Sequence, residues 1–413
     1  MRELEPLAFD RALRDAAREL DRRKMTGEAL ADALPEYLLD EETLHWLRES
    51  KAKDPLAAPL ELWLLRLREQ VELDRRRSEL AEAHRVQLHG ISDPEQTRLP
   101  LSEMLRLALT RPRERAVYLR SFFASAAAVS DQVRRLWEER LMFADRLKTS
   151  LDSFEVASPE LTPAAARLIE NTRGAFETLR VDSPERLLST ALAEDAQEGW
   201  PARLSPRTAL DLLGDHTWVH GLRLRPFSTP AARGAGSFML ALESAGRAIS
   251  DAASAQRSPF VLACDVFDLR RNGLGALLGM LPLSPEFATR RLGLAPSRVR
   301  DQQRHLARAT LVDVRVSAFR VLLRQLLLRG SKAIDGDLPE LSDGALGFEL
   351  PSAVAGAFIR VRARDSQRFA ALLLASSRHE TLVQTHDEDW FRNPRAIAEL
   401  RAELNEPAPD LPT

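Results

Sequence analysis

The residues with the clearest potential for chemistry lie near position 215, where Asp215 and His216 are followed by His220. Two histidines four positions apart can share a helix face and bind a metal ion, and a neighbouring carboxylate can add a third ligand. Gly214 directly precedes them, and glycine is common where a helix ends. Because a helix ending there would separate the histidines, we expect unrelated polar residues, with a metal site at Asp215, His216 and His220 as the alternative.

Glu243, Ser244 and Arg247 lie in an apolar run from Phe238 to Ala253 that contains no proline. The run is long enough for a helix of about four turns. Taken alone, it predicts an ordinary apolar helix that carries one glutamate and one arginine.

Cys264 is the single cysteine of the chain, which excludes an intramolecular disulfide and a cysteine metal cluster. It follows the apolar residues 260–263, so we expect a buried thiol rather than a nucleophile. Gly234 and Gly236 precede a predicted helix, but without a lysine or a clear strand before them they are only a weak indication of phosphate binding.

The overall composition is that of a folded protein without an unusual charge. The chain has 413 residues, 44% hydrophobic and 29% charged, with a formal net charge of −2. This length allows one large core or two to three domains. The balanced charge gives no reason to expect nucleic acid or an anionic membrane as a partner. We find no signal peptide and no apolar run near the ~20 residues of a spanning helix, so we expect a cytoplasmic protein.

The periodicity of apolar residues predicts helices almost throughout. They cover residues 10–23, 40–50, 59–82, 101–109, 112–147, 297–329 and 353–377, with a Gly- and Asp-containing loop before the last. Further helix starts are indicated where a hydroxyl residue precedes proline, at Thr162, Ser183, Ser205 and Ser284. Only residues 222–226 and 260–264 have the pattern of short strands.

The helix predicted over residues 297–329 carries many arginines outside its apolar stripe. They are Arg298, Arg300, Arg304, Arg308, Arg315, Arg320 and Arg324. We expect a solvated or ion-paired helix face, with a site for an anionic partner as the alternative.

The segment from Leu242 to Ile249 also resembles the zinc-binding helix of thimet-oligopeptidase-type and oligoendopeptidase-type metallopeptidases, which has the pattern Leu-His-Glu-x-Gly-His-Ala-Leu. In this register Glu243 stands in place of the first histidine and Arg247 in place of the second. Ser244 stands in place of the general-base glutamate.

Four further segments resemble this family in order and spacing, namely residues 137–147, 272–285, 352–360 and 387–396. In the second, Asn272 replaces the glutamate that is the third zinc ligand. In the third, Ala357 and Phe358 replace tyrosines that stabilise the tetrahedral intermediate. The fourth, which contains Asp-Trp-Phe-Arg-Asn-Pro, is close to the ending of bacterial members. The resemblance covers roughly residues 55–405.

The resemblance implies a mainly α, large multi-helix, gluzincin-like fold of the thimet and neurolysin type, with little β structure. It further implies an N-terminal helical region, residues 1–230, and a pseudo-catalytic helical region, residues 231–405, packed around one cleft. Residues 406–413 would form a tail.

The substitutions remove the zinc chemistry that the family uses. A guanidinium has no lone pair to give a metal, so Arg247 puts a cation where zinc would lie. Ser244 cannot act as a general base near neutral pH without a helper, and Asn272 offers only a neutral amide oxygen. Instead, Arg247 can form an ion pair with Glu243 one helical turn away.

We therefore expect a catalytically inactive homologue without metal or cofactor. It would bind a peptide or protein, partner an active paralogue, or form a homodimer. The alternatives are a hydrolase with a relocated metal site near Asp215, His216 and His220, and a structural α-helical adaptor.

Overall fold

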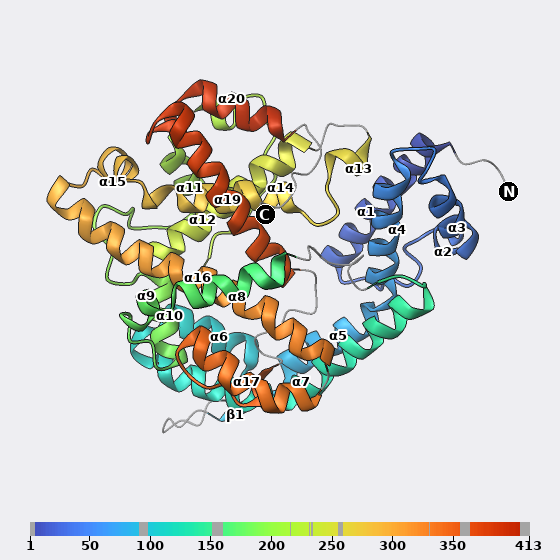
Figure 1. Ribbon diagram of the computed structural model, residues 1–413, viewed down its shortest axis with the longest axis horizontal. Coiled ribbons are helices and arrows are strands. Elements are labelled where there is room, and N and C mark those ends of the chain that lie inside the picture. The colour runs from blue at the N-terminus through green and yellow to red at the C-terminus, as the bar shows by residue number, and fades with distance from the viewer. Residues whose placement is uncertain are drawn as a thin grey trace.

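The structure is a computed structural model that describes residues 5–90, 98–150, 160–214, 216–230, 232, 234–254, 259–329, 331–355 and 364–404. Within these ranges almost all regular structure is helical, which confirms the prediction of a mainly α fold (Figure 1). The strands found there, β1 (Leu88–Gly90) and β2 (Arg98–Pro100), pair antiparallel with Leu88 opposite Pro100. The predicted tail, residues 406–413, lies outside the described residues.

The helices and their bounds are as follows. The α-helices are α1 (Pro6–Thr26), α2 (Glu36–Leu39), α3 (Glu41–Ser50), α4 (Ala57–Glu72), α5 (Asp74–Val86), α6 (Leu101–Thr110), α7 (Arg115–Arg146), α8 (Leu161–Asn171), α9 (Arg173–Glu177), α10 (Pro184–Leu192), α11 (Pro206–Leu213), α12 (Ala235–Ser254), α13 (Phe260–Ala263), α14 (Leu269–Met280), α15 (Pro285–Arg291), α16 (Pro296–Arg329), α17 (Ser331–Leu346), α19 (Arg364–His386) and α20 (Pro394–Glu403). The 3-10 helices are η1 (Pro112–Glu114), η3 (His216–Trp218), η4 (Leu281–Leu283), η5 (Ser352–Val354) and η6 (Trp390–Arg392).

Most of the predicted helix starts and ends are present, with the expected local chemistry. Ser183, Ser205 and Ser284 each cap a helix by accepting a hydrogen bond from a backbone N–H of its first turn. Gly214 ends α11 with a φ of 70°, a left-handed conformation that glycine adopts without a Cβ penalty. Thr162 is not a cap, because α8 already begins at Leu161.

Both predicted strands were wrong. Residues 222–226 have no regular secondary structure, and Phe260–Ala263 is the short helix α13. The carboxylate of Asp10 in α1 accepts hydrogen bonds from the backbone N–H groups of Phe260 and Val261, at 2.8 and 2.9 Å. A carboxylate from a distant part of the chain thus satisfies the exposed donors at the start of α13, and no local pattern contains that information.

Two predicted boundaries also differ from the structure. The helix predicted over residues 59–82 is divided between α4 and α5 at the buried Leu73, whose backbone leaves the helical conformation. The loop predicted before residue 353 contains α17, even though Pro339 lies inside that helix. Ile334, Leu338, Ala345 and Leu346 are buried at helical spacing, so core packing outweighs the glycines and the proline.

The prediction of a solvated or ion-paired face for the arginines of α16 is wrong for Arg315. Arg315 is fully buried, and Arg324 is also buried. Nε of Arg315 donates to the carbonyl oxygen of Ala345 at 3.0 Å, and Nη1 donates to that of Ile169 at 2.7 Å. Arg315 therefore binds carbonyl groups near the ends of α17 and α8, which are unpaired in any helix.

The described residues pack around three main hydrophobic cores. One joins α7, α8, α16, α17 and α19; a second joins α11, α12, α14, α15, α19 and α20; a third joins α1, α3, α4, α13 and the end of α7. In Figure 1, helices α1 to α4, which contribute most of the third core, lie at one side of the molecule. The short helix α13 lies between them and α14. The division of the chain near residue 230 stays a prediction.

A search of the described helices for a membrane-crossing segment finds none with sufficient length and apolar character.

Candidate functional site

The helices that carry the candidate zinc-site positions, α12 and α14, pack against each other at very close range. A Cβ on Gly246 of α12 would lie 2.9 Å from Cα of Gly275 in α14. A Cβ on Gly275 would in turn lie 3.0 Å from Cγ of Arg247. Glycines at the contact therefore let the two backbones approach. The resemblance requires the two helices to meet, and they do.

Glu243 is buried at this contact and binds two arginines from different helices. Its Oε2 lies 3.2 Å from Nη1 of Arg247, which is the ion pair expected from their spacing. Its Oε1 lies 2.5 Å from Nη2 of Arg368, which comes from α19. Arg368 also pairs with Asp313 of α16. We call Glu243, Arg247, Arg368 and Asp313 the Glu243 cluster; it joins α12, α16 and α19.

The electrostatics of the cluster keep its arginines charged. Burial lowers the pKa of Arg368, but the carboxylates of Asp313 and Glu243 more than offset this effect and hold the pKa above its usual range. Burial also lowers the pKa of Arg247, which Glu243 partly opposes. Because an arginine guanidinium keeps its proton in proteins, both side chains are cations at neutral pH.

Ser244 contacts this cluster, and neither Ser244 nor Asn272 takes part in its ion pairs. The hydroxyl of Ser244 donates to the carbonyl oxygen of Leu240 at 3.0 Å and accepts from Nη2 of Arg247 at 3.2 Å. Asn272 is half-buried on α14. The preceding residue, Arg271, pairs with Asp251 of α12 at 2.7 Å, which places Asn272 beside the α12–α14 contact.

These residues do not fit a zinc ion of the kind that the family binds. The carboxylate of Glu243 is already engaged by two guanidinium groups, and Arg247 has no lone pair to donate. A catalytic zinc site needs three protein ligands such as imidazole or carboxylate and an open position for water. The arrangement instead holds an anion between cations, and a zinc ion would have to displace both guanidinium groups from Glu243.

The remaining positions of the resemblance have different outcomes. Ala357 and Phe358 lie outside the described residues, so the replacement of the family's tyrosines stays a prediction. Trp137 is buried in α7, where the guanidinium of Arg140 lies 5.1 Å from its ring centre. Trp390 and Phe391 are fully buried, and Nε1 of Trp218 donates to the carbonyl oxygen of Phe391 at 3.1 Å. Their role in this fold is packing.

The structure describes only part of the alternative metal site. Asp215 lies outside the described residues, and His220 is exposed. Because α11 ends at Leu213 and η3 covers only His216–Trp218, the two histidines do not share a continuous helix. Among the described residues, no three side chains of the types His, Cys, Asp or Glu are grouped as a metal site requires.

The other residues considered for chemistry serve the packing of the fold. Cys264 is half-buried, and burial raises the pKa of its thiol to about 11, so little reactive thiolate forms at neutral pH. Cβ atoms at Gly234 and Gly236 would collide with the backbone of Leu192 and Ala191 at the end of α10. These glycines allow the start of α12 to pack there.

The sequence did not indicate Arg368 and Asp313. Arg368 follows Glu243 by more than one hundred residues, and Asp313 follows it by about seventy. In the sequence, each is an ordinary charged residue of a predicted helix. Only the packing of α16 and α19 against α12 brings them to the same carboxylate.

No family model matches the chain, and no curated protein matches it.

Proposed function

We propose that this protein is a non-catalytic relative of zinc metallopeptidases that acts in the cytoplasm by binding a peptide or protein. The observation that carries the proposal is the Glu243 cluster. At the positions where the resemblance expects the first and second zinc ligands, a glutamate and an arginine form an ion pair instead, and Arg368 adds a second cation.

The cluster gives the scaffold a stabilising function in place of a catalytic one. A buried carboxylate needs compensating charge and hydrogen bonds, which Arg247 and Arg368 provide. Removal of one partner of such a network leaves an uncompensated buried charge. The cluster therefore joins α12, which carries two of the expected ligand positions, to α16 and α19 without a metal.

The polar side chains of α12 and α14 at the positions of the resemblance are suited to recognition rather than to bond cleavage. Ser244 and Asn272 are half-buried, and Arg247 has 29% of its side chain exposed. A hydroxyl, an amide and a guanidinium supply donors and acceptors for a peptide backbone. None of them activates water near neutral pH without a base or a metal.

The first experiment tests the family relationship by rebuilding the metal site. A variant with Glu243→His, Ser244→Glu, Arg247→His and Asn272→Glu restores the family's ligand pattern, and zinc binding is measured by isothermal titration calorimetry. We expect tight binding of one zinc ion. The matched control omits Arg247→His and is expected to bind none. If neither folded variant binds zinc, the proposed relationship is wrong.

The second experiment separates binding from catalysis. A pool of fluorescent octapeptides is followed for fluorescence anisotropy and for cleavage, with and without added zinc. We expect binding without cleavage, and weaker binding by Asn272→Ala. Gly273→Ala, whose new Cβ would meet no atom closer than 3.9 Å, is the matched control and should bind like the wild type.

Two outcomes of this experiment would contradict the proposal. Peptide cleavage that is lost on chelation and in His216→Ala or His220→Ala would indicate the relocated metal site. If the wild type does not bind the peptides, or if Asn272→Ala binds them equally well, the proposed peptide site is wrong. A structural adaptor would then be the remaining function.

A further inference from the structure

A second candidate binding site lies in the N-terminal part of the molecule, away from the Glu243 cluster. It is a groove of about 930 Å³ between the loop after α1, the start of α3, the junction of α4 and α5, and the end of α7. Its volume is within the range of small-ligand sites, roughly 300–1,000 Å³. No residue of α12, α14, α16 or α19 lines it.

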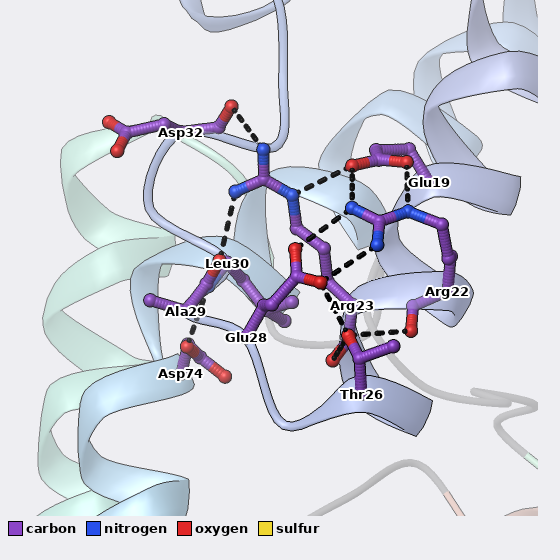
Figure 2. Close-up of polar contacts among 9 residues, drawn as sticks. All are labelled: Glu19, Arg22, Arg23, Thr26, Glu28, Ala29, Leu30, Asp32 and Asp74. Carbon is purple, nitrogen blue, oxygen red and sulfur yellow. Dashed lines mark hydrogen bonds and ion pairs between the residues drawn. The ribbon is translucent and has the colours of Figure 1, made fainter.

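One wall of this groove is the loop after α1, which is held in place by polar contacts (Figure 2). Arg22 bridges Glu19 and Glu28, with nitrogen–oxygen distances of 2.7–2.9 Å. Arg23 donates to the carbonyl oxygen of Ala29 at 3.0 Å. Because these contacts already order the loop, ligand binding would not carry the entropic cost of ordering it.

Asp74 presents a carboxylate to the groove from the start of α5. Its Oδ2 accepts a hydrogen bond from the backbone N–H of Leu30 at 3.0 Å, as Figure 2 shows. Its Oδ1 has no hydrogen bond to a described residue. The side chain is half-buried, so a carboxylate oxygen remains available at a fixed position.

Arg68 presents the opposite charge from α4 at the same groove. It is 4% exposed, and its Nε and Nη2 donate to the carbonyl oxygens of Leu38 and Asp40, at 2.6 and 2.5 Å. Its Nη1 has no hydrogen bond to a described residue, and it has no carboxylate in contact within the described ranges. Burial lowers the pKa of Arg68 to about 10, although the nearby carboxylates of Asp40 and Glu41 oppose this effect. A buried cation in this state favours an anionic partner.

Most other charged groups of the groove are paired, but Glu41 also lines it and its carboxylate acts on Arg68. Glu72 pairs with Arg146 at 2.6 Å, and Glu79 pairs with Arg75 at 3.0 Å. Between them the groove has apolar surface, including Leu39, which is 42% exposed. The carboxylates of the groove would repel a ligand that is only an anion, and Arg68 would repel a ligand that is only a cation.

We propose that this groove binds a short peptide in its zwitterionic form, with the terminal carboxylate at Arg68, the terminal ammonium at Asp74 and an apolar side chain against Leu39. Arg68 and Asp74 are six positions apart across the junction of α4 and α5, which corresponds to a rise of about 9 Å between their backbones. An extended chain advances about 3.3–3.6 Å per residue, so a peptide of about three residues has a comparable length.

The test uses the tripeptide Ala-Leu-Ala and the full-length protein in isothermal titration calorimetry. We expect saturable binding that weakens roughly tenfold or more when the peptide is N-acetylated, and likewise when it is C-amidated, since each change removes one charge-assisted contact. Free leucine separates an amino-acid site from a peptide site, and it should bind more weakly than the tripeptide. Equal binding of the blocked peptides, tighter binding of leucine or no binding would overturn the proposal.

A pair of matched variants tests the protein side. Asp74→Asn keeps an acceptor for the N–H of Leu30 but removes the charge, and it should weaken Ala-Leu-Ala binding at least severalfold. Asp54→Asn is the control, because Asp54 also accepts a backbone N–H, that of Leu56 at 2.8 Å, but does not line the groove. If both variants bind like the wild type, Asp74 does not hold the ammonium group and the proposal is wrong.

The inference does not depend on the proposed function. Asn272→Ala, which tests peptide binding at the α12–α14 contact, should leave Ala-Leu-Ala binding in the groove unchanged. Loss of tripeptide binding in Asn272→Ala would place the peptide at the other site and overturn this assignment.

Discussion

The side chain of Glu243 lies directly against Gly279. A Cβ at position 279 would stand 2.5 Å from Cγ of Glu243 and 3.2 Å from its Oε1. Arg247 and Arg368 hold the carboxylate of Glu243, so this side chain cannot move aside and keep both ion pairs. The position of the Glu243 cluster therefore depends on the absence of a side chain at residue 279.

Gly279→Ala should destabilise the protein by about 1–3 kcal/mol, because the new methyl group overpacks the α12–α14 contact. Urea unfolding followed by circular dichroism measures the change. Gly273→Ala on the same helix is the control, since a Cβ there meets only Leu374 at 3.9 Å. The control should be neutral or more stable by up to about 1 kcal/mol, because alanine favours helix over glycine. Equal stability of the two variants would contradict the role of Gly279.

Glu243→Gln should lower the free energy of unfolding by about 3–5 kcal/mol, because it leaves Arg247 and Arg368 without their shared carboxylate. Arg247→Met should have a smaller effect, since 29% of the Arg247 side chain is exposed and water already screens part of the interaction. Chemical denaturation at pH 7 gives both values. Glu42→Gln, on an exposed residue in the first turn of α3, should lower the stability by no more than about 1 kcal/mol. A Glu243→Gln protein as stable as this control would show that the cluster contributes little.

Arg315→Lys should destabilise the protein by at least about 3 kcal/mol, even though the charge is kept. The flat guanidinium reaches carbonyl oxygens of Ile169, Gly344 and Ala345 at once and lies 4.3 Å from the ring centre of Phe176. An ammonium group cannot replace that fork of donors. The melting temperature of Arg315→Lys is compared with that of Arg308→Lys, a control at an exposed position of the same helix. The control should melt at the same temperature as the wild type.

The loop after α1 should become less stable in acid. Hydrogen bonds from Arg22 and Thr26 lower the pKa of Glu28 from its ordinary value of 4.5 to about 2. A depressed carboxylate pKa means that the unfolded state binds more protons, so the stabilisation is complete above pH 4.5 and is lost as the pH falls toward 2. Hydrogen exchange of the loop amides between pH 5 and pH 2.5, corrected for intrinsic rates, should show falling protection. In Glu28→Gln, protection should already be low at pH 5 and should change less with pH.

Local sequence patterns were sufficient for much of the helical framework. The capping serines Ser183, Ser205 and Ser284 and the left-handed Gly214 act within a few residues of their own positions. The pair of Glu243 and Arg247 is also local, because one helical turn separates them. Such features depend on backbone geometry that the neighbouring residues themselves determine.

The errors arose where distant parts of the chain supply the deciding contact. Phe260–Ala263 has the composition of a strand, but it forms a helix whose first backbone N–H groups donate to the carboxylate of Asp10. Arg315 has the spacing of a surface arginine, but the ends of α8 and α17 meet at it.

The sequence by itself determined a mainly helical chain and the chemical types at the candidate site: a carboxylate, a hydroxyl and a guanidinium on one helix. The tertiary structure decided what surrounds them. Arg368 and Asp313 reach Glu243 only through the packing of α16 and α19, and the free faces of Arg68 and Asp74 meet only in the fold. The physical reason is that helix formation and capping act over a few residues, whereas the burial of a charge depends on every element packed around it.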